Sequence, residues 1–242
     1  LFARELQAMG VAKGDRVAVG MRNLPEWPVA FFGALLVGAV VVPLNAWSTG
    51  PELEYVLNDS GACVGVFDGE RFERLKGHLD ACPALRIVLV SRAEGPLDHA
   101  RAESWETLIG RTADWARLPV FDAPSVAIAP DDDATIFYTS GTTGRPKGVA
   151  VAHPSICNFV RVAAESYGFG VGDRVYQGMS IAFDFSVEEL WVPLVAGATL
   201  VPNASANSLF GEELAEFLES RAVTCFCCVP TLLASIERDL PN

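Results

Sequence analysis

The sequence predicts an α/β fold built from two pseudo-repeated units, each a parallel sheet flanked by helices. An ordered internal repeat is the main reason. The tetrapeptide Gly-Asp-Arg-Val occurs at 14–17 and again at 172–175, 158 residues later. A second match, Gly-Ala followed by an apolar strand pattern ending in proline, occurs at 38–43 and 197–202, 159 residues apart. Two matches in the same order at nearly one offset indicate a duplicated strand–helix–strand unit.

The first copy of the repeat contains a long uncharged stretch, residues 27–47. Its length would suit a membrane span. Gly38 and Pro43 interrupt it, so we expect a helix over about Glu26–Val37 and a buried strand over Ala39–Val42 instead. A helix followed by a buried parallel strand explains this hydropathy without a membrane.

The remaining elements alternate between helix and strand in the same manner. The expected helices are Pro51–Leu57, a short one near Trp105–Ile109, Val187–Ala196 and Glu212–Ser220, and the expected strands are Ala62–Phe67, Arg86–Val90 and Ala222–Val229. This alternation favours parallel sheets in both copies.

Composition excludes several classes of function. The chain has 242 residues and a net charge of −12, and its basic residues are scattered rather than gathered in a stripe, which argues against nucleic-acid binding. The six cysteines show no disulfide-framework spacing and are typical of reduced thiols in a cytoplasmic protein. Cys225, Cys227 and Cys228 lack the spacing of a zinc site, so we expect no metal site formed by this chain.

The most informative motif is the segment 138–148, Tyr-Thr-Ser-Gly-Thr-Thr-Gly-Arg-Pro-Lys-Gly. Its glycines let backbone N–H groups turn toward a ligand, its hydroxyls donate hydrogen bonds and its lysine adds a positive charge, a combination that suits a polyphosphate. It is not a Walker A loop, because Gly148 follows Lys147 where a serine or threonine is required. Residues 149–152 read as a strand, so the segment is predicted to be a strand–loop–strand element.

These eleven residues resemble the phosphate-binding motif of the adenylate-forming superfamily, which includes acyl-CoA synthetases, peptide-synthetase adenylation domains and luciferases. Leu35–Asn45 is similar to the family's early helix–strand motif, and Ala182–Val201 is similar to the segment that forms one wall of its acid pocket. The resemblance implies the family's large N-terminal domain, with two similar α/β subdomains, in incomplete form.

The resemblance also implies a two-step reaction. A carboxylate attacks the α-phosphate of Mg-ATP, giving an acyl-adenylate and pyrophosphate, and a thiol of coenzyme A or of a carrier protein's phosphopantetheine then displaces AMP. Preorganised donors in the loop would stabilise the leaving pyrophosphate. The residues implied to hold the β- and γ-phosphates are Thr139, Ser140, Gly141, Thr142, Thr143, Gly144 and Lys147.

The expected domain organisation follows from the same resemblance. Residues 1–242 form part of an AMP-binding large domain, with roughly 20–168 as the first subdomain and 1–19 together with 169–242 as part of the second. The chain starts at Leu1 inside a helix-like pattern, which indicates a piece of a longer protein. The family's catalytic residues and small C-terminal domain come later in sequence, so the fragment is expected to be inactive alone.

The two halves of the chain suggest different acids. Residues 1–120 resemble a fatty- or aryl-acid CoA ligase, whereas residues 150–242 resemble an amino-acid adenylation domain. In amino-acid-activating members the aspartate matching Asp184 pairs with the substrate ammonium, and Phe185 and Glu188 match pocket positions beside it. The alternatives are that Asp184 caps the following helix and that Glu188 is a solvated helix residue.

The sequence therefore favours an amino-acid adenylation module, and Glu188 adds the hypothesis of a cationic substrate such as lysine or ornithine. A fatty- or aryl-acid CoA ligase and a non-enzymatic nucleotide-binding fragment remain alternatives. The expected partners are a small carboxylic or amino acid and a carrier-protein domain, with neither nucleic acid nor membrane. The thiol acceptor and the oligomeric state are left open.

Overall fold

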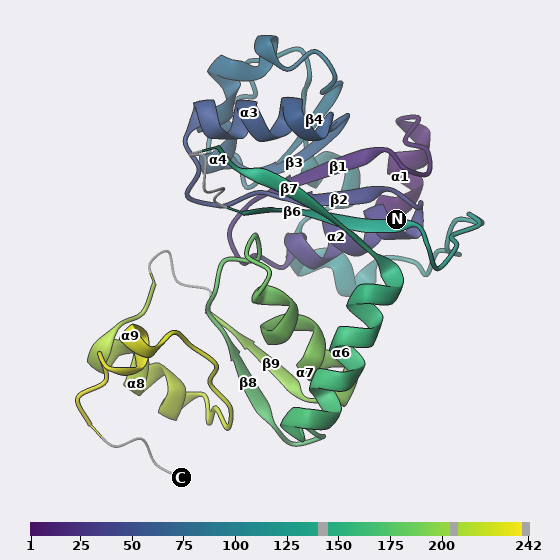
Figure 1. Cartoon of the computed structure of the whole chain (residues 1–242). Helices are drawn as coiled ribbons and strands as arrows, with labels where there is room; N and C mark the ends of the chain where they lie inside the picture. Colours follow the sequence, from purple (N-terminus) through teal and green to yellow (C-terminus); the bar gives the residue numbers. More distant parts are fainter. Residues whose placement is uncertain (140–144, 204–207, 239–242) are drawn as a thin grey trace. The chain divides into compact units, whose positions relative to one another are not determined.

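The computed structural model describes residues 1–139, 145–203 and 208–238, and its internal packing divides the chain after Pro154 into two units. The first unit comprises residues 1–154 and the second residues 155–242. The elements of both are labelled in Figure 1.

The first unit is a seven-stranded sheet with the order β5-β4-β3-β1-β2-β6-β7. All neighbouring pairs are parallel except β6 and β7, which are antiparallel at the sheet edge. The strands are β1 Arg16–Gly20, β2 Val40–Pro43, β3 Val64–Asp68, β4 Ile87–Ser91, β5 Ala102–Ser104, β6 Asp133–Thr139 and β7 Lys147–Ala152. Strands β2, β3 and β4 are buried along almost their whole length, as expected for parallel strands covered on both faces.

Helices cover both faces of this sheet, with α2 and α3 on opposite sides (Figure 1). The chain moves from β1 to β2 in one direction and from β2 to β3 in the other, so right-handed crossovers place the two helices on opposite faces. The helices are α1 Phe2–Ala8, α2 Glu26–Leu36, α3 Gly50–Ser60, α4 Gly69–Leu75 and α5 Trp105–Ile109, with 3₁₀ turns η1 Lys76–Ala81 and η2 Thr112–Arg117.

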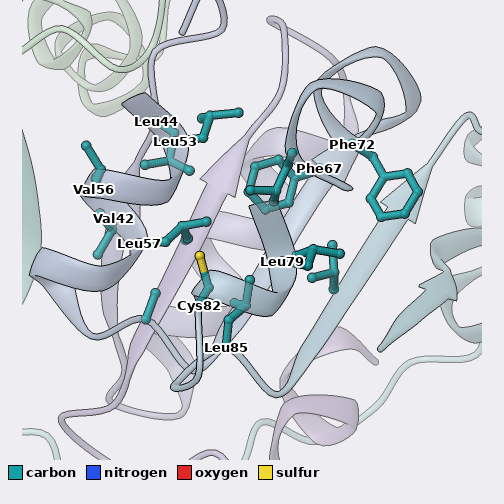
Figure 2. Close-up of a cluster of buried hydrophobic side chains, with 14 of the residues drawn as sticks. Val42, Leu44, Leu53, Val56, Leu57, Phe67, Phe72, Leu79, Cys82 and Leu85 are labelled. Atoms are coloured by element: carbon teal, nitrogen blue, oxygen red, sulfur yellow. The ribbon is translucent and has the colours of Figure 1, made fainter. Parts of the chain in front are cut away.

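The core on the α3 side is a cluster of buried apolar side chains from α3, α4, η1 and the central strands (Figure 2). Phe67 of β3 lies within it, close to Leu57 and Leu85. Helix α3 enters this core in a fixed direction, because Thr49 and Glu52 form a capping box at its start and Gly61 ends it in the left-handed conformation.

The uncharged stretch 27–47 folds as predicted, as most of α2, the turn at Gly38 and strand β2. The expected strands and helices of residues 51–109 are likewise confirmed to within a few residues. Among the described residues, no helix is both long enough and apolar enough to cross a membrane.

The second unit holds a two-stranded parallel sheet of β8 and β9. Its elements are α6 His153–Tyr167, which begins just before the boundary, then β8 Arg174–Gln177, the π-helical turn η3 Val187–Trp191, α7 Val192–Ala196, β9 Thr199–Pro202, α8 Gly211–Ser220 and α9 Pro230–Leu233. Tyr176 packs with Leu214 and Leu218 in the core of this unit. The strand expected over Ala222–Val229 is reduced to one parallel bridge between Cys225 and Val175.

The internal repeat is confirmed at the level of backbone hydrogen bonds. Strands β1 and β2 pair with Arg16 opposite Val40, and β8 and β9 pair with Arg174 opposite Thr199. The bonds around these pairs also match, since the Val40 and Thr199 amides both donate over 2.8 Å to the aspartate carbonyl before the first strand. The two sequence motifs therefore mark one supersecondary unit used twice.

The repeat also locates an extra residue in the second copy. The offset is 158 residues at the first strand (16 to 174) and 159 at the second (40 to 199), so one residue is inserted between them. The connecting helix is a regular α-helix in the first copy, α2, but begins with the π turn η3 in the second. A π turn takes up one extra residue within a helix, which accounts for the change.

The grouping of residues 1–19 differs from the sequence expectation, which placed them with residues 169–242. Strand β1 hydrogen-bonds to both β2 and β3 inside the seven-stranded sheet, so residues 1–19 belong to the first unit. The residues of α6 from Ser155 onward belong to the second unit.

Candidate functional site

The phosphate motif lies at the edge of the first unit's sheet. Strand β6 ends at Thr139 and β7 begins at Lys147, and these two residues face each other as an antiparallel pair. The predicted strand–loop–strand element is thus confirmed, and its ends bring the Thr139 and Lys147 side chains together at the base of the loop. The predicted contacts Ser140, Gly141, Thr142, Thr143 and Gly144 lie outside the described residues.

The base of the loop presents donors to solvent. Thr139 and Lys147 are both exposed, and the Lys147 ammonium makes no ion pair with any residue the structure describes. An exposed cation beside a hydroxyl, on a chain of net charge −12, is a local site for an anionic ligand. The described residues therefore fit the phosphate groups of a nucleotide.

Two tyrosines that sequence reasoning missed hold this hairpin against α3. The Tyr138 hydroxyl donates to Asp59 Oδ2 over 2.7 Å, and the Tyr55 hydroxyl donates to the Pro146 carbonyl over 3.1 Å. Burial and the Asp59 carboxylate raise the pKa of Tyr138 well above its usual value, so its hydroxyl remains a donor. Their spacing on one helix face, Tyr55 and Asp59 at i and i+4, was the signal available in the sequence.

Gly148 has a steric role in the same hairpin. A Cβ atom there would lie 2.9 Å from Ile136 Cγ2 and 3.0 Å from Tyr138 Cζ. The glycine after the lysine therefore lets the Tyr138 ring cross β7 on its way to Asp59, and it is explained by packing in addition to any ligand contact.

The second group of predicted residues lies on the connection from β8 to the π turn η3. We call residues 178–186 the acid loop. Asp184 is exposed, and its Oδ1 accepts from the adjacent Phe185 N–H over 2.9 Å. The N-cap of η3 is Ser186, and no side chain caps it, so among the described residues Asp184 does not act as the helix cap.

Glu188 lies in the first turn of η3 and is half-buried. Its Oε2 accepts from the Tyr167 hydroxyl over 2.8 Å, and this bond raises the pKa of Tyr167. The carboxylate is therefore held by a neutral donor within its own unit and keeps its negative charge uncompensated by any described cation. Phe185, also half-buried, lies between the two carboxylates in sequence.

Glu189 is the functional candidate that sequence reasoning missed. It is 1% exposed, and its Oε2 accepts from the Met179 N–H over 2.9 Å and from Gln177 Nε2 over 3.4 Å. Its Oε1 is buried without a hydrogen-bond partner. Burial, only partly offset by these bonds, raises the pKa of Glu189 to about 7. The only sequence signal was a charged residue inside the apolar run that ends at Trp191.

Comparison with known proteins places this arrangement in a family. A family model for AMP-binding enzymes matches residues 1–242, so the chain belongs to the AMP-binding enzyme family. It is 41% identical over 243 residues to the delta-poly-L-ornithine synthetase of Acinetobacter baumannii, which covers 100% of this chain and 16% of that protein. It is 33% identical over 240 residues to the L-proline–[L-prolyl-carrier protein] ligase of Pseudomonas fluorescens, covering 98% of this chain and 45% of that protein.

A solved structure with the same fold is the anthranilate CoA ligase AuaEII in complex with anthranoyl-AMP. It matches with a TM-score of 0.81 and 26% identity, over 97% of this chain and 43% of that one. The chain thus spans less than half the length of these three relatives. The family resemblance stated from the motifs is confirmed, and the relatives include ligases named for amino acids and for an aryl acid.

Proposed function

We propose that the full-length protein containing this chain activates a carboxylic acid with ATP, forming an acyl-adenylate and pyrophosphate, and then transfers the acyl group to a thiol. The best-supported substrate is an amino acid. The observation that carries this choice is the exposed Asp184 carboxylate on the acid loop, which no described cation neutralises.

The proposed nucleotide site is the loop between β6 and β7. Lys147 and Thr139 are proposed to contact the β- and γ-phosphates, together with Ser140, Gly141, Thr142, Thr143 and Gly144. Mg²⁺ would accompany ATP and neutralise part of its charge during the displacement. The exposed ammonium at the base of a rigidly anchored hairpin supports this assignment, because preorganised donors stabilise charge on a leaving pyrophosphate.

The internal repeat supports a cation at Asp184. Counted back by the 158-residue offset of the first strand, Asp184 corresponds to Glu26 at the start of α2. Glu26 is buried and pairs with the guanidinium of Arg92 through contacts of 3.0 and 3.1 Å. The first copy therefore binds a cation internally at this position, whereas in the second copy the carboxylate is available for the ammonium of a substrate.

Glu188 supports a cationic side chain on the substrate. It supplies a second carboxylate one turn beyond Asp184, and among the described residues only the neutral Tyr167 hydroxyl is seen to bond it. A relative 41% identical to this chain is named as a delta-poly-L-ornithine synthetase. Ornithine or lysine is therefore the proposed substrate, with Phe185 as a further pocket residue.

The thiol acceptor in this proposal is a carrier-protein phosphopantetheine or coenzyme A, and two relatives of this chain are named as a carrier-protein ligase and a CoA ligase. An aryl-acid CoA ligase is the second candidate, favoured by the structural match to the anthranilate CoA ligase. All six cysteines are free thiols, which supports a cytoplasmic location. The 242-residue fragment alone is proposed to be inactive.

The test is ATP–pyrophosphate exchange by the full-length protein with L-ornithine, L-lysine, a neutral amino acid and an aryl acid as probes. We expect exchange with the diamino acids, and its loss in Asp184→Ala, because a buried ammonium without a partner is costly. Glu188→Gln should reduce the preference for diamino over neutral acids. Exchange with the aryl acid that is unaffected by Asp184→Ala would reject the amino-acid proposal in favour of the second candidate.

A further inference from the structure

The buried carboxyl group of Glu189 is not required by the fold. Depending on which side of the inserted residue one counts from, its counterpart in the first copy is Phe31 or Ala30. Both are apolar and at least 97% buried. The same supersecondary unit is therefore built in α2 with an apolar residue where the second copy places an acid. Burying a carboxyl group is unfavourable, so its presence needs a reason other than packing.

Glu189 reaches back to the start of the acid loop. Its Oε2 accepts the Met179 N–H over 2.9 Å, and the side-chain amide of buried Gln177 donates both to the same Oε2 and, over 2.7 Å, to the Met179 carbonyl. Both hydrogen-bonding groups of the Met179 backbone are thus held by side chains. The far end of the loop is held separately, because Ser186 Oγ donates to the Ile181 carbonyl over 2.9 Å.

The acid loop carries Asp184 and Phe185 between these two fixed ends, and Glu188 follows directly in the π turn. The inserted residue of the π turn and the inward-facing Glu189 occur together in the second copy and are both absent from the first. The Oε1 atom that remains without a partner shows that the carboxyl group is placed at an energetic cost. Such costs persist where the surrounding structure serves a site.

We propose that Glu189 is a positioning residue for the acid site, and that it fixes the acid loop so that Asp184 is presented to the substrate ammonium. The proposal rests on the function proposed for Asp184. Glu189 is itself 1% exposed, so it acts through the loop and does not contact the acid.

The test compares Glu189→Leu and Glu189→Gln in the full-length protein. Leucine imitates the apolar counterpart in the first copy and should fold, since replacing a buried acid by a well-packed apolar residue is often neutral or stabilising. Glutamine keeps an oxygen that can accept the Met179 N–H. Glu213→Ala, an exposed acid on α8 in the same unit, is the matched control.

Two measurements separate positioning from general damage. Hydrogen exchange of the peptide covering 178–186 should be faster by about 10-fold or more in Glu189→Leu and near wild type in Glu189→Gln and the control. In ATP–pyrophosphate exchange with L-ornithine, the KM for the amino acid should rise about 10-fold in Glu189→Leu, with the KM for ATP unchanged, and glutamine should restore it.

Unchanged exchange of residues 178–186 in Glu189→Leu would overturn the proposal, as would an equal rise of both KM values. If the loop loosens but the wild-type protein activates no amino acid, the anchoring role stands and the proposed substrate class is wrong. If leucine does not fold, as shown by thermal melting, the fold itself requires the carboxyl group and the positioning role is rejected.

Discussion

The buried carboxyl group of Glu189 should make the protein less stable as the pH rises through neutrality. Its pKa is about 7 in the folded protein, against an ordinary value of 4.5. The folded state therefore keeps the proton over a range in which the unfolded chain has lost it. Between these two values each rise in pH favours the unfolded chain, and above pH 7 the full cost of ionising the buried group is present.

The size of the effect follows from proton linkage. A shift of this size corresponds to roughly 3 kcal/mol when fully developed. Between about pH 5.5 and pH 8 the loss amounts to ~2 kcal/mol, because part of the linkage is already complete at the lower pH. Glu189→Gln removes the titrating group while keeping the shape of the side chain. Its free energy of unfolding should therefore gain ~2 kcal/mol relative to wild type over the same range.

The assay is urea unfolding of both proteins at a series of pH values, followed by circular dichroism and by tryptophan fluorescence. Other groups also titrate, so the quantity to compare is the difference between the two proteins at each pH. The groups facing Glu189 are Tyr176, Cys227 and Cys228, which stay in both variants. A difference that stays constant from pH 5.5 to pH 8 would show that Glu189 is ionised throughout and would refute this reasoning.

Three further predictions concern the first unit. Tyr138→Phe removes the hydrogen bond to Asp59 and should lower the free energy of unfolding by ~1 kcal/mol and raise the KM for ATP, measured in urea titrations and steady-state kinetics. Gly148→Ala should cost about 1–3 kcal/mol by the same titrations, because its Cβ would lie 3.0 Å from the Tyr138 ring, and an unchanged midpoint would contradict this packing. Glu26→Ala should lower the thermal midpoint by several degrees through loss of the Arg92 pair, whereas Arg117→Ala, an exposed residue, should leave it unchanged.

Sequence patterns were sufficient for the parts of the fold that depend on local chemistry. Gly38 and Pro43 mark the turn and strand end that divide the uncharged stretch, and both effects are properties of single residues. The repeat motif at 14–17 likewise predicted a register that the hydrogen bonds confirm. In the candidate site, the strand–loop–strand setting of Lys147 was predictable because β-propensity changes sharply at the glycines.

The features that sequence reasoning missed depend on tertiary packing. The burial of Glu189 cannot be seen in a helical pattern, because the π turn shifts the face on which residue 189 lies. The same is true of Tyr55, whose partner Pro146 is distant in sequence. Residues 1–19 were assigned to the wrong unit because β1 contributes to a sheet whose neighbours are set by crossover handedness and not by local sequence.

The π turn at Val187–Trp191 has an evolutionary consequence. An insertion of one codon in the helix of one duplicated unit leaves the flanking strand register intact, since β8 and β9 pair like β1 and β2 on either side of it. A gene can therefore acquire a differently directed set of side chains in one copy while the other copy retains the ancestral helix. The first copy then serves as a preserved record of the fold before specialisation, against which every substitution in the second can be compared.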